Sequence, residues 1–105
     1  MKLVAPVFAV LTMLVSGGAS AADDFGRTLS LTGLSGNTAY AAFTEGLSGP
    51  CKYNIVYLGD VSLPQTKALL AMLVAARSSG GKVAHIGYTI NSDTTCSSTQ
   101  LEIGP

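Results

Sequence analysis

Charged side chains are scarce in this 105-residue sequence, and tryptophan is absent. Only 11% of the residues are charged, and the six basic side chains formally cancel the six acidic ones. A protein that binds nucleic acid by neutralising phosphates needs clustered lysine and arginine, so we expect no nucleic-acid partner. The hydrophobic content of 48% argues equally against an intrinsically disordered chain. The length suits one small domain.

Residue sets that carry catalysis or bind metals are also missing. The only histidine is His85, and no aspartate or serine accompanies it in a recognisable catalytic motif. Scattered carboxylates do not form a metal-ligand set, and no phosphate-binding or dinucleotide-binding glycine motif is present. We therefore expect no enzyme activity, no metal and no cofactor, with His85 on the outer face of a strand. A small hydrolase stays open only if His85 lies in a pocket with a carboxylate.

The first 21 residues have the pattern of a secretory signal peptide. Lys2 gives a positive start, residues 3–15 are apolar except at Pro6 and Thr12, and residues 19–21 fit an A-x-A cleavage site. This apolar run is shorter than the roughly 20 residues that a transmembrane helix needs. We predict a secreted or periplasmic bacterial protein with no transmembrane anchor and a single mature domain over residues 22–105.

The two cysteines, Cys51 and Cys96, both fall within the mature domain. An exported chain with an even cysteine count normally pairs them, and no C-x-x-C motif indicates a redox site. The bond would close a loop of 45 residues. For a loop of this length the chain-entropy model gives roughly 4 kcal/mol of stabilisation. We therefore predict a structural disulfide.

Five segments have the alternation or the composition of β-strands. Leu29 and Leu31 alternate with polar residues over 27–32, and the turn residues at 34–37 predict a hairpin with a strand over 38–44. Further strands are predicted over residues 52–58, 82–91 and 99–103.

One helix is predicted between the third and fourth strands. Ser62 and Gln65 fit a capping box with Pro64 in the first turn, and Gly80 follows the expected end near Ser79. Apolar side chains cover most of its circumference, and a helix of this kind must be covered nearly all round. One small sheet covers only part of it, so we expect an oligomer interface; the alternative is a helix enclosed by a curled sheet. The interface residues are predicted to be Leu69, Leu70, Met72, Leu73 and Val74.

Three strands, a helix and two strands predict a mainly-β domain with one helix. The economical architecture is a small five-stranded Greek-key barrel of the OB-fold type. A small α+β open sheet is the alternative.

Residues 51–103 resemble the B subunit of subtilase cytotoxin and related bacterial toxin-binding subunits. The resemblance rests on Cys51 with the strand after it, the leucine-rich helix ending in Gly81-Lys82-Val83, and Cys96 before a short final strand. It implies an OB-fold subunit that assembles as a homopentameric ring and binds sialylated or other cell-surface glycans. It also implies a catalytic A subunit carried through the central pore. The sugar-contacting residues of that family are not transferred to positions here.

A glycan pocket on a neutral domain needs hydroxyl and amide groups, an aromatic face and at most one cation. The predicted glycan-binding residues are Ser35, Asn37, Thr38, Tyr40 and Lys52. The alternative is that they are ordinary turn and strand surface. The resemblance implies the secreted binding subunit of an A-plus-five-B toxin or an adhesin. The alternative function is a secreted structural or protein-interaction module, such as an inhibitor or envelope factor, without glycan binding.

Overall fold

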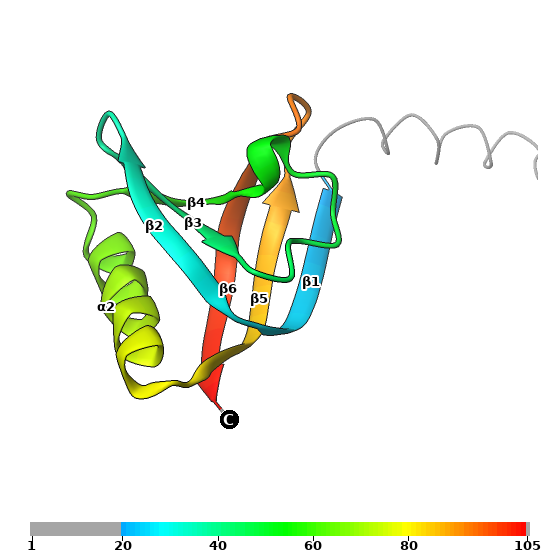
Figure 1. Ribbon diagram of the computed structural model, residues 1–105. Coiled ribbons are helices and arrows are strands. Elements are labelled where there is room, and N and C mark those ends of the chain that lie inside the picture. Colours follow the sequence, from blue (N-terminus) through cyan, green and yellow to red (C-terminus); the bar gives the residue numbers. More distant parts are fainter. Residues whose placement is uncertain (1–19, 105) are drawn as a thin grey trace, which may run out of the picture.

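The computed structural model describes residues 20–104. It confirms the predicted mainly-β fold with one helix, because six strands form one sheet with an α-helix beside it (Figure 1). The strands are β1 (Ser20–Arg27), β2 (Leu29–Ser35), β3 (Thr38–Phe43), β4 (Val56–Asp60), β5 (Lys82–Ile90) and β6 (Cys96–Gly104). A 3₁₀ turn, η1 (Lys52–Asn54), precedes β4, and the helix α2 (Pro64–Ser79) follows it.

Most of the predicted signal peptide lies outside the described residues. Its last two positions, Ser20 and Ala21, begin β1 and pair with Ile90 and Thr89 of β5. No helix within residues 20–104 has the length and hydrophobicity that a membrane span requires.

The two edges of the sheet are consecutive in the chain. The strand order is β1-β5-β6-β4-β3-β2, yet only Thr28 separates β1 from β2. The sheet therefore curls until its edges meet at Thr28 (Figure 1). The hydrogen-bonded ladder is an open sheet, which is the alternative that the sequence predicted beside the closed barrel. Its two edges are halves of one bent strand, an arrangement related to the partly open five-stranded barrel.

Hydrogen bonds hold the bend at Thr28. The Glu45 carboxylate accepts the backbone N–H of Thr28 at 2.6 Å and its hydroxyl at 2.7 Å. The Thr28 carbonyl accepts the N–H of Thr44 at 2.8 Å, and Arg27 Nε donates to the Gly46 carbonyl at 2.9 Å. The hydrogen bonds from Thr28 lower the pKa of Glu45 to about 2, so this carboxylate is ionised at neutral pH.

Two predicted strands differ in detail. The alternation of Leu29 and Leu31 breaks at a β-bulge between them, so Leu29 is buried whereas Leu31 is exposed. The strand predicted over residues 52–58 begins only at Val56, because Tyr53 and Asn54 take left-handed conformations with φ of 61° and 56°. The β2–β3 hairpin itself is confirmed, with Ser35 paired to Thr38.

The predicted capping box is wrong, whereas the predicted helix end is confirmed. The Ser62 N–H and hydroxyl both donate to Asp60, at 2.8 and 2.6 Å, so Ser62 stabilises the turn before the helix. Leu63 occupies the N-cap position without a side-chain hydrogen bond. At the other end Gly80 takes φ 76°, the left-handed conformation that ends many helices.

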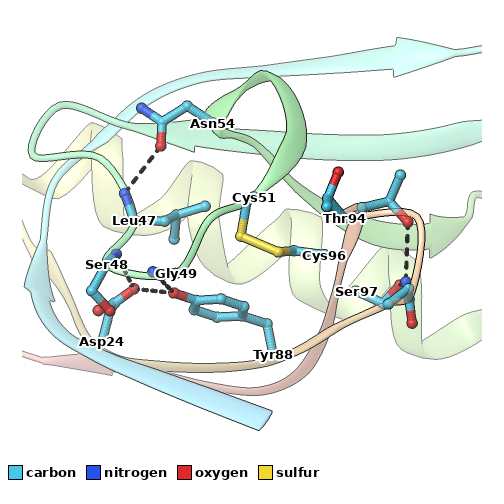
Figure 2. The surroundings of a disulfide bond; sticks show 12 residues. Asp24, Leu47, Ser48, Gly49, Cys51, Asn54, Tyr88, Thr94, Cys96 and Ser97 are labelled. Atoms are coloured by element: carbon cyan, nitrogen blue, oxygen red, sulfur yellow. Dashed lines mark hydrogen bonds between the residues drawn. A yellow bond between two sulfur atoms is a disulfide. The ribbon is translucent and has the colours of Figure 1, made fainter. Parts of the chain in front are cut away.

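The core lies between the curled sheet and α2, and the predicted disulfide is at its margin. Cys51 and Cys96 are bonded, which joins the start of η1 to the start of β6 (Figure 2). The largest completely buried side chains are Tyr88, Leu73, Ile86, Val56, Val83, Thr66 and Cys96.

Gly59 allows the helix to approach β4 closely. Its φ is 125°, a conformation that is available essentially only to glycine. A Cβ at this position would lie 2.6 Å from Oγ1 of the buried Thr66. The strand therefore needs glycine here both for its backbone conformation and for the space occupied by Thr66.

We predict that Gly59→Ala lowers the free energy of unfolding by about 2–4 kcal/mol, because backbone strain and a steric clash add. Urea denaturation monitored by circular dichroism measures this change. The control is Gly36→Ala, where φ is also positive at 63° but no atom lies within 4 Å of the added Cβ. This control should lose only about 1–2 kcal/mol. Equal losses in the two variants would contradict the role given to Thr66.

Candidate functional site

Three tyrosines line a shallow pocket of about 270 Å³. We call it the tyrosine pocket; its lining residues are Ser35, Tyr40, Tyr53, Ile55 and Tyr57. Tyr40 of β3 and Tyr57 of β4 are cross-strand partners, with ring centroids 6.2 Å apart in an edge-to-face arrangement. Neighbouring strands thus provide two aromatic walls, and Ser35 adds a hydroxyl from the end of β2.

A glycine on the edge strand fixes the position of the Tyr40 ring. Gly33 of β2 is the cross-strand partner of Tyr40. A Cβ at Gly33 would lie 2.5 Å from ring atom Cζ of Tyr40, so the ring lies directly over the glycine backbone. The close approach requires a residue with no side chain at position 33.

Tyr53 supplies the third wall from the strained turn η1. Its side chain is 73% exposed, and the Lys52 ammonium lies 5.5 Å from its ring centroid, within the range of a cation–π interaction. Consecutive non-glycine residues with positive φ are strained and persist only where surrounding contacts hold them. Here the contacts are the Cys51–Cys96 disulfide, the Lys52 N–H bond to the Thr94 carbonyl at 2.8 Å and the Leu47 N–H bond to Asn54 Oδ1 at 3.2 Å.

A buried carboxylate anchors the loop that leads to η1. Asp24 of β1 is 3% exposed and accepts hydrogen bonds from the Tyr88 hydroxyl at 2.6 Å and the Ser48 N–H at 3.0 Å (Figure 2). The Gly49 N–H donates to the same Tyr88 hydroxyl at 3.0 Å. Burial by itself raises the pKa of Asp24. The hydrogen bonds from Ser48 and Tyr88 and the nearby charge of Arg27 lower it by more, so the pKa is below its ordinary value. The carboxylate therefore remains ionised and holds the loop against β1 and β5.

The structure brings together some of the predicted glycan-binding residues. Ser35 and Tyr40 both line the tyrosine pocket, and Lys52 lies beside its Tyr53 wall. Asn37 is in the hairpin turn outside this lining, where its carbonyl accepts the Val61 N–H at 2.9 Å. Thr38 lines a different groove, next to α2.

Sequence reasoning did not single out Tyr53, Ile55 and Tyr57. Ile55 and Tyr57 are two positions apart in extended backbone, which places their side chains on the same side, so the alternation was a signal for these two residues. Tyr53 had no such signal, because its left-handed conformation lies outside the strand.

The five predicted interface residues have unequal exposure. Leu73 is completely buried in the chain's own core, so its predicted place at an interface is corrected to an anchor of α2 on the sheet. Met72 and Val74 are 38% and 52% exposed. Leu69 and Leu70 are partly buried against the core.

A second and larger concavity, which we call the helix groove, lies between α2, β4 and β6. Its volume is about 740 Å³. The helix contributes apolar side chains, including Leu69 and Met72, and β6 contributes hydroxyl groups, including Ser97 and Ser98. The size is within the usual range of ligand-binding pockets, roughly 300–1,000 Å³.

His85 lies on the outer face of β5 between two carboxylates. Its Nε2 is 2.8 Å from Asp23 Oδ1 of β1, and its Nδ1 is 2.9 Å from Glu102 Oε1 of β6. Phe25 stacks on the imidazole with a centroid distance of 4.7 Å. His85 lines neither the tyrosine pocket nor the helix groove. The hydrogen bond to Asp23 outweighs desolvation and, with that to Glu102, raises the pKa of His85.

Within residues 20–104, no group of three or more histidine, cysteine, aspartate or glutamate residues is placed to hold a metal ion. Comparison of the chain with family models, curated proteins and solved structures gives no match.

We predict that the folded state loses stability as the pH rises above the ordinary His85 pKa of 6.5. A raised folded-state pKa means that the folded protein binds the His85 proton more tightly than the unfolded chain does. The contribution of His85 to the stability of the fold is therefore complete below pH 6.5, and it disappears as the pH rises through the folded-state pKa. Urea denaturation across this pH range measures the effect. His85→Gln should remove this pH dependence, and a slope that persists in that variant would contradict the assignment.

Proposed function

We propose that this protein is a secreted carbohydrate-binding subunit of the toxin or adhesin type, which recognises cell-surface glycans through the tyrosine pocket. The observation that carries the proposal is the meeting of three tyrosine side chains with the Ser35 hydroxyl in one exposed pocket. Sugar rings present an apolar face and a rim of hydroxyl groups. Aromatic rings and hydroxyl groups are the protein partners that match these two surfaces.

The position of the pocket supports the same proposal. It lies on β3 and β4, the second and third strands if β1 and β2 are counted as one bent strand. In five-stranded barrels of the OB type, this face and the adjacent loops bind oligosaccharides or oligonucleotides. The near-neutral composition of the chain disfavours an oligonucleotide, because phosphate binding needs clustered cations. Lys52 next to Tyr53 provides one cation for an acidic sugar.

The exposed part of α2 supports assembly into an oligomer. Met72 and Val74 remain exposed on the isolated chain, and Leu63 just before the helix is 42% exposed. Met72 and Val74 are two positions apart and point to different sides of the helix, so its apolar surface is broad and is only partly covered by the chain's own sheet. The proposed assembly is a homopentameric ring that presents several tyrosine pockets to one surface. A catalytic A subunit bound to the ring belongs to the same proposal.

The alternative is a protein-interaction module that does not bind sugars. The apolar surface of α2 favours this alternative as well, because a different protein could cover it. The two functions differ in what binds to the tyrosine pocket, so variants of the pocket separate them.

We predict that the purified protein binds glycans on an array and that Tyr53→Ala weakens this binding about tenfold or more. Loss of one stacking wall removes part of the contact with the sugar ring, and a factor of ten corresponds to about 1.4 kcal/mol. Titration of the bound glycan by isothermal calorimetry gives the dissociation constants. Because Tyr53 is largely exposed, its truncation should leave the fold intact.

Phe25→Ala is the matched control, since Phe25 is an aromatic residue with 65% exposure that does not line the tyrosine pocket. This variant should retain the affinity of the unaltered protein. Absence of binding to both sialylated and neutral glycans would overturn the proposed function. An equal loss of glycan affinity in the Tyr53→Ala and Phe25→Ala variants would also contradict the assignment of glycan binding to the tyrosine pocket.

We predict a stable homo-oligomer in size-exclusion chromatography with light scattering, and its dissociation in Val74→Glu. A carboxylate at an apolar interface must be desolvated without a partner, which strongly disfavours association. Ser92→Glu adds the same charge at an exposed position outside α2 and should leave the oligomer intact. A monomer at high concentration in the unaltered protein would contradict the ring.

A further inference from the structure

A disulfide joins one wall of the tyrosine pocket to the sheet. Tyr53 lies in η1, two residues after Cys51. Cys51 is bonded to Cys96, the first residue of β6, which is completely buried and pairs with Ile90 of β5 (Figure 2). The disulfide therefore connects the Tyr53 wall to two inner strands of the sheet.

The hydrogen bonds of η1 lead to loops instead. The Lys52 N–H donates to the carbonyl of Thr94, which lies between β5 and β6 and has a positive φ of 69°. The Leu47 N–H donates to Asn54 Oδ1 from the loop that follows β3. Two such hydrogen bonds offset no more than the strain of two non-glycine residues with positive φ, so they do not by themselves hold Tyr53 and Asn54 in place.

The sheet has contacts of its own that do not involve the disulfide. β5 is paired with β6 along its whole length and with β1 on its other side. The loop before η1 is anchored separately, because the Asp24 carboxylate accepts the Ser48 N–H. Loss of the disulfide therefore releases residues 50–55, whereas the chain stays fixed at Ser48 and at Val56, where β4 begins.

Reduction of the bond can begin at Cys51, which is partly exposed, whereas Cys96 is completely buried. A thiolate of a dithiol reductant attacks Cys51 Sγ, the S–S bond breaks, and Cys96 leaves as a thiolate that takes up a proton. The second thiol of the reductant then displaces Cys51, which takes the proton of that thiol. Two protein thiols result, and the reductant is oxidised to its own disulfide.

We propose that the Cys51–Cys96 disulfide is a redox switch for the tyrosine pocket. In the oxidised protein Tyr53 forms the third wall. In the reduced protein η1 relaxes, the wall is lost and glycan affinity falls, while the six-stranded sheet remains folded. The effect on glycans rests on the proposed function, whereas the movement of Tyr53 needs no ligand. The protein thus holds a glycan in oxidising surroundings and releases it where a dithiol reductant is present.

Amide NMR of the isotope-labelled protein, with and without dithiothreitol, tests the switch without a ligand. We expect the shifts of residues 52–54 to move to random-coil values on reduction, and those of residues 82–90 to keep their folded values. Unchanged shifts at residues 52–54 overturn the proposal. Random-coil shifts at residues 82–90 also overturn it, because the whole fold would then depend on the bond. A bond that resists dithiothreitol in the folded protein overturns it as well.

Calorimetric titration with sialyllactose and with lactose tests the effect on binding. Reduction should lower the affinity of the unaltered protein about tenfold or more, as Tyr53→Ala does. In Tyr53→Ala itself, reduction should have no further effect, because the wall is already absent. An equal loss on reduction in both proteins would show that the disulfide acts on the pocket by another route and would overturn the role given to Tyr53.

Leu73→Ala is the control for a general loss of stability. It leaves a cavity beneath α2, where Leu73 is completely buried, and it does not touch the lining of the tyrosine pocket. The oxidised variant should keep the affinity of the unaltered protein. Absence of glycan binding in the oxidised unaltered protein overturns the proposed function, whereas the amide shifts of η1 still decide whether the disulfide holds Tyr53.

Discussion

The structure depends on one stretch of chain serving both edges of the sheet. Because β1 and β2 are separated by Thr28 alone, the other four strands must fit within the curve between them. The bend is held by hydrogen bonds that Thr28 makes to the ionised Glu45 carboxylate. This curvature gives the small domain a closed interior for Tyr88 and Ile86, and it leaves a face on β3 and β4 for the tyrosine pocket.

A second constraint acts at η1, where stabilising contacts are concentrated around a strained backbone. The disulfide at Cys51 and the buried Asp24 carboxylate act on the two ends of the same loop (Figure 2). The outcome is that Tyr53, the most exposed wall of the tyrosine pocket, projects from one of the best-anchored segments. A binding surface held in this way loses little conformational entropy when a ligand arrives.

Four features were predictable from the sequence because each has a local signal or a pairing rule: the fold class, the helix end at Gly80, the β2–β3 hairpin and the disulfide. The start of β4 was not predictable. It depends on the left-handed conformation of Tyr53, which is held by contacts with Thr94 and by the disulfide, both distant in sequence. For the site, the hydroxyl groups and the aromatic face that a sugar requires pointed to Ser35 and Tyr40. The helix groove could not be predicted, because it exists only where two strands that are far apart in the sequence diverge.

The cluster around His85 has a consequence for the environments in which the sheet stays intact. With carboxylates on both ring nitrogens, a neutral imidazole can donate to only one of them, whereas the imidazolium donates to both. Many histidine switches release a strand or an interface when a vesicle acidifies. This histidine works in the opposite sense, because protonation at mildly acidic pH gives both carboxylates a hydrogen-bond donor and so strengthens the contacts among β1, β5 and β6.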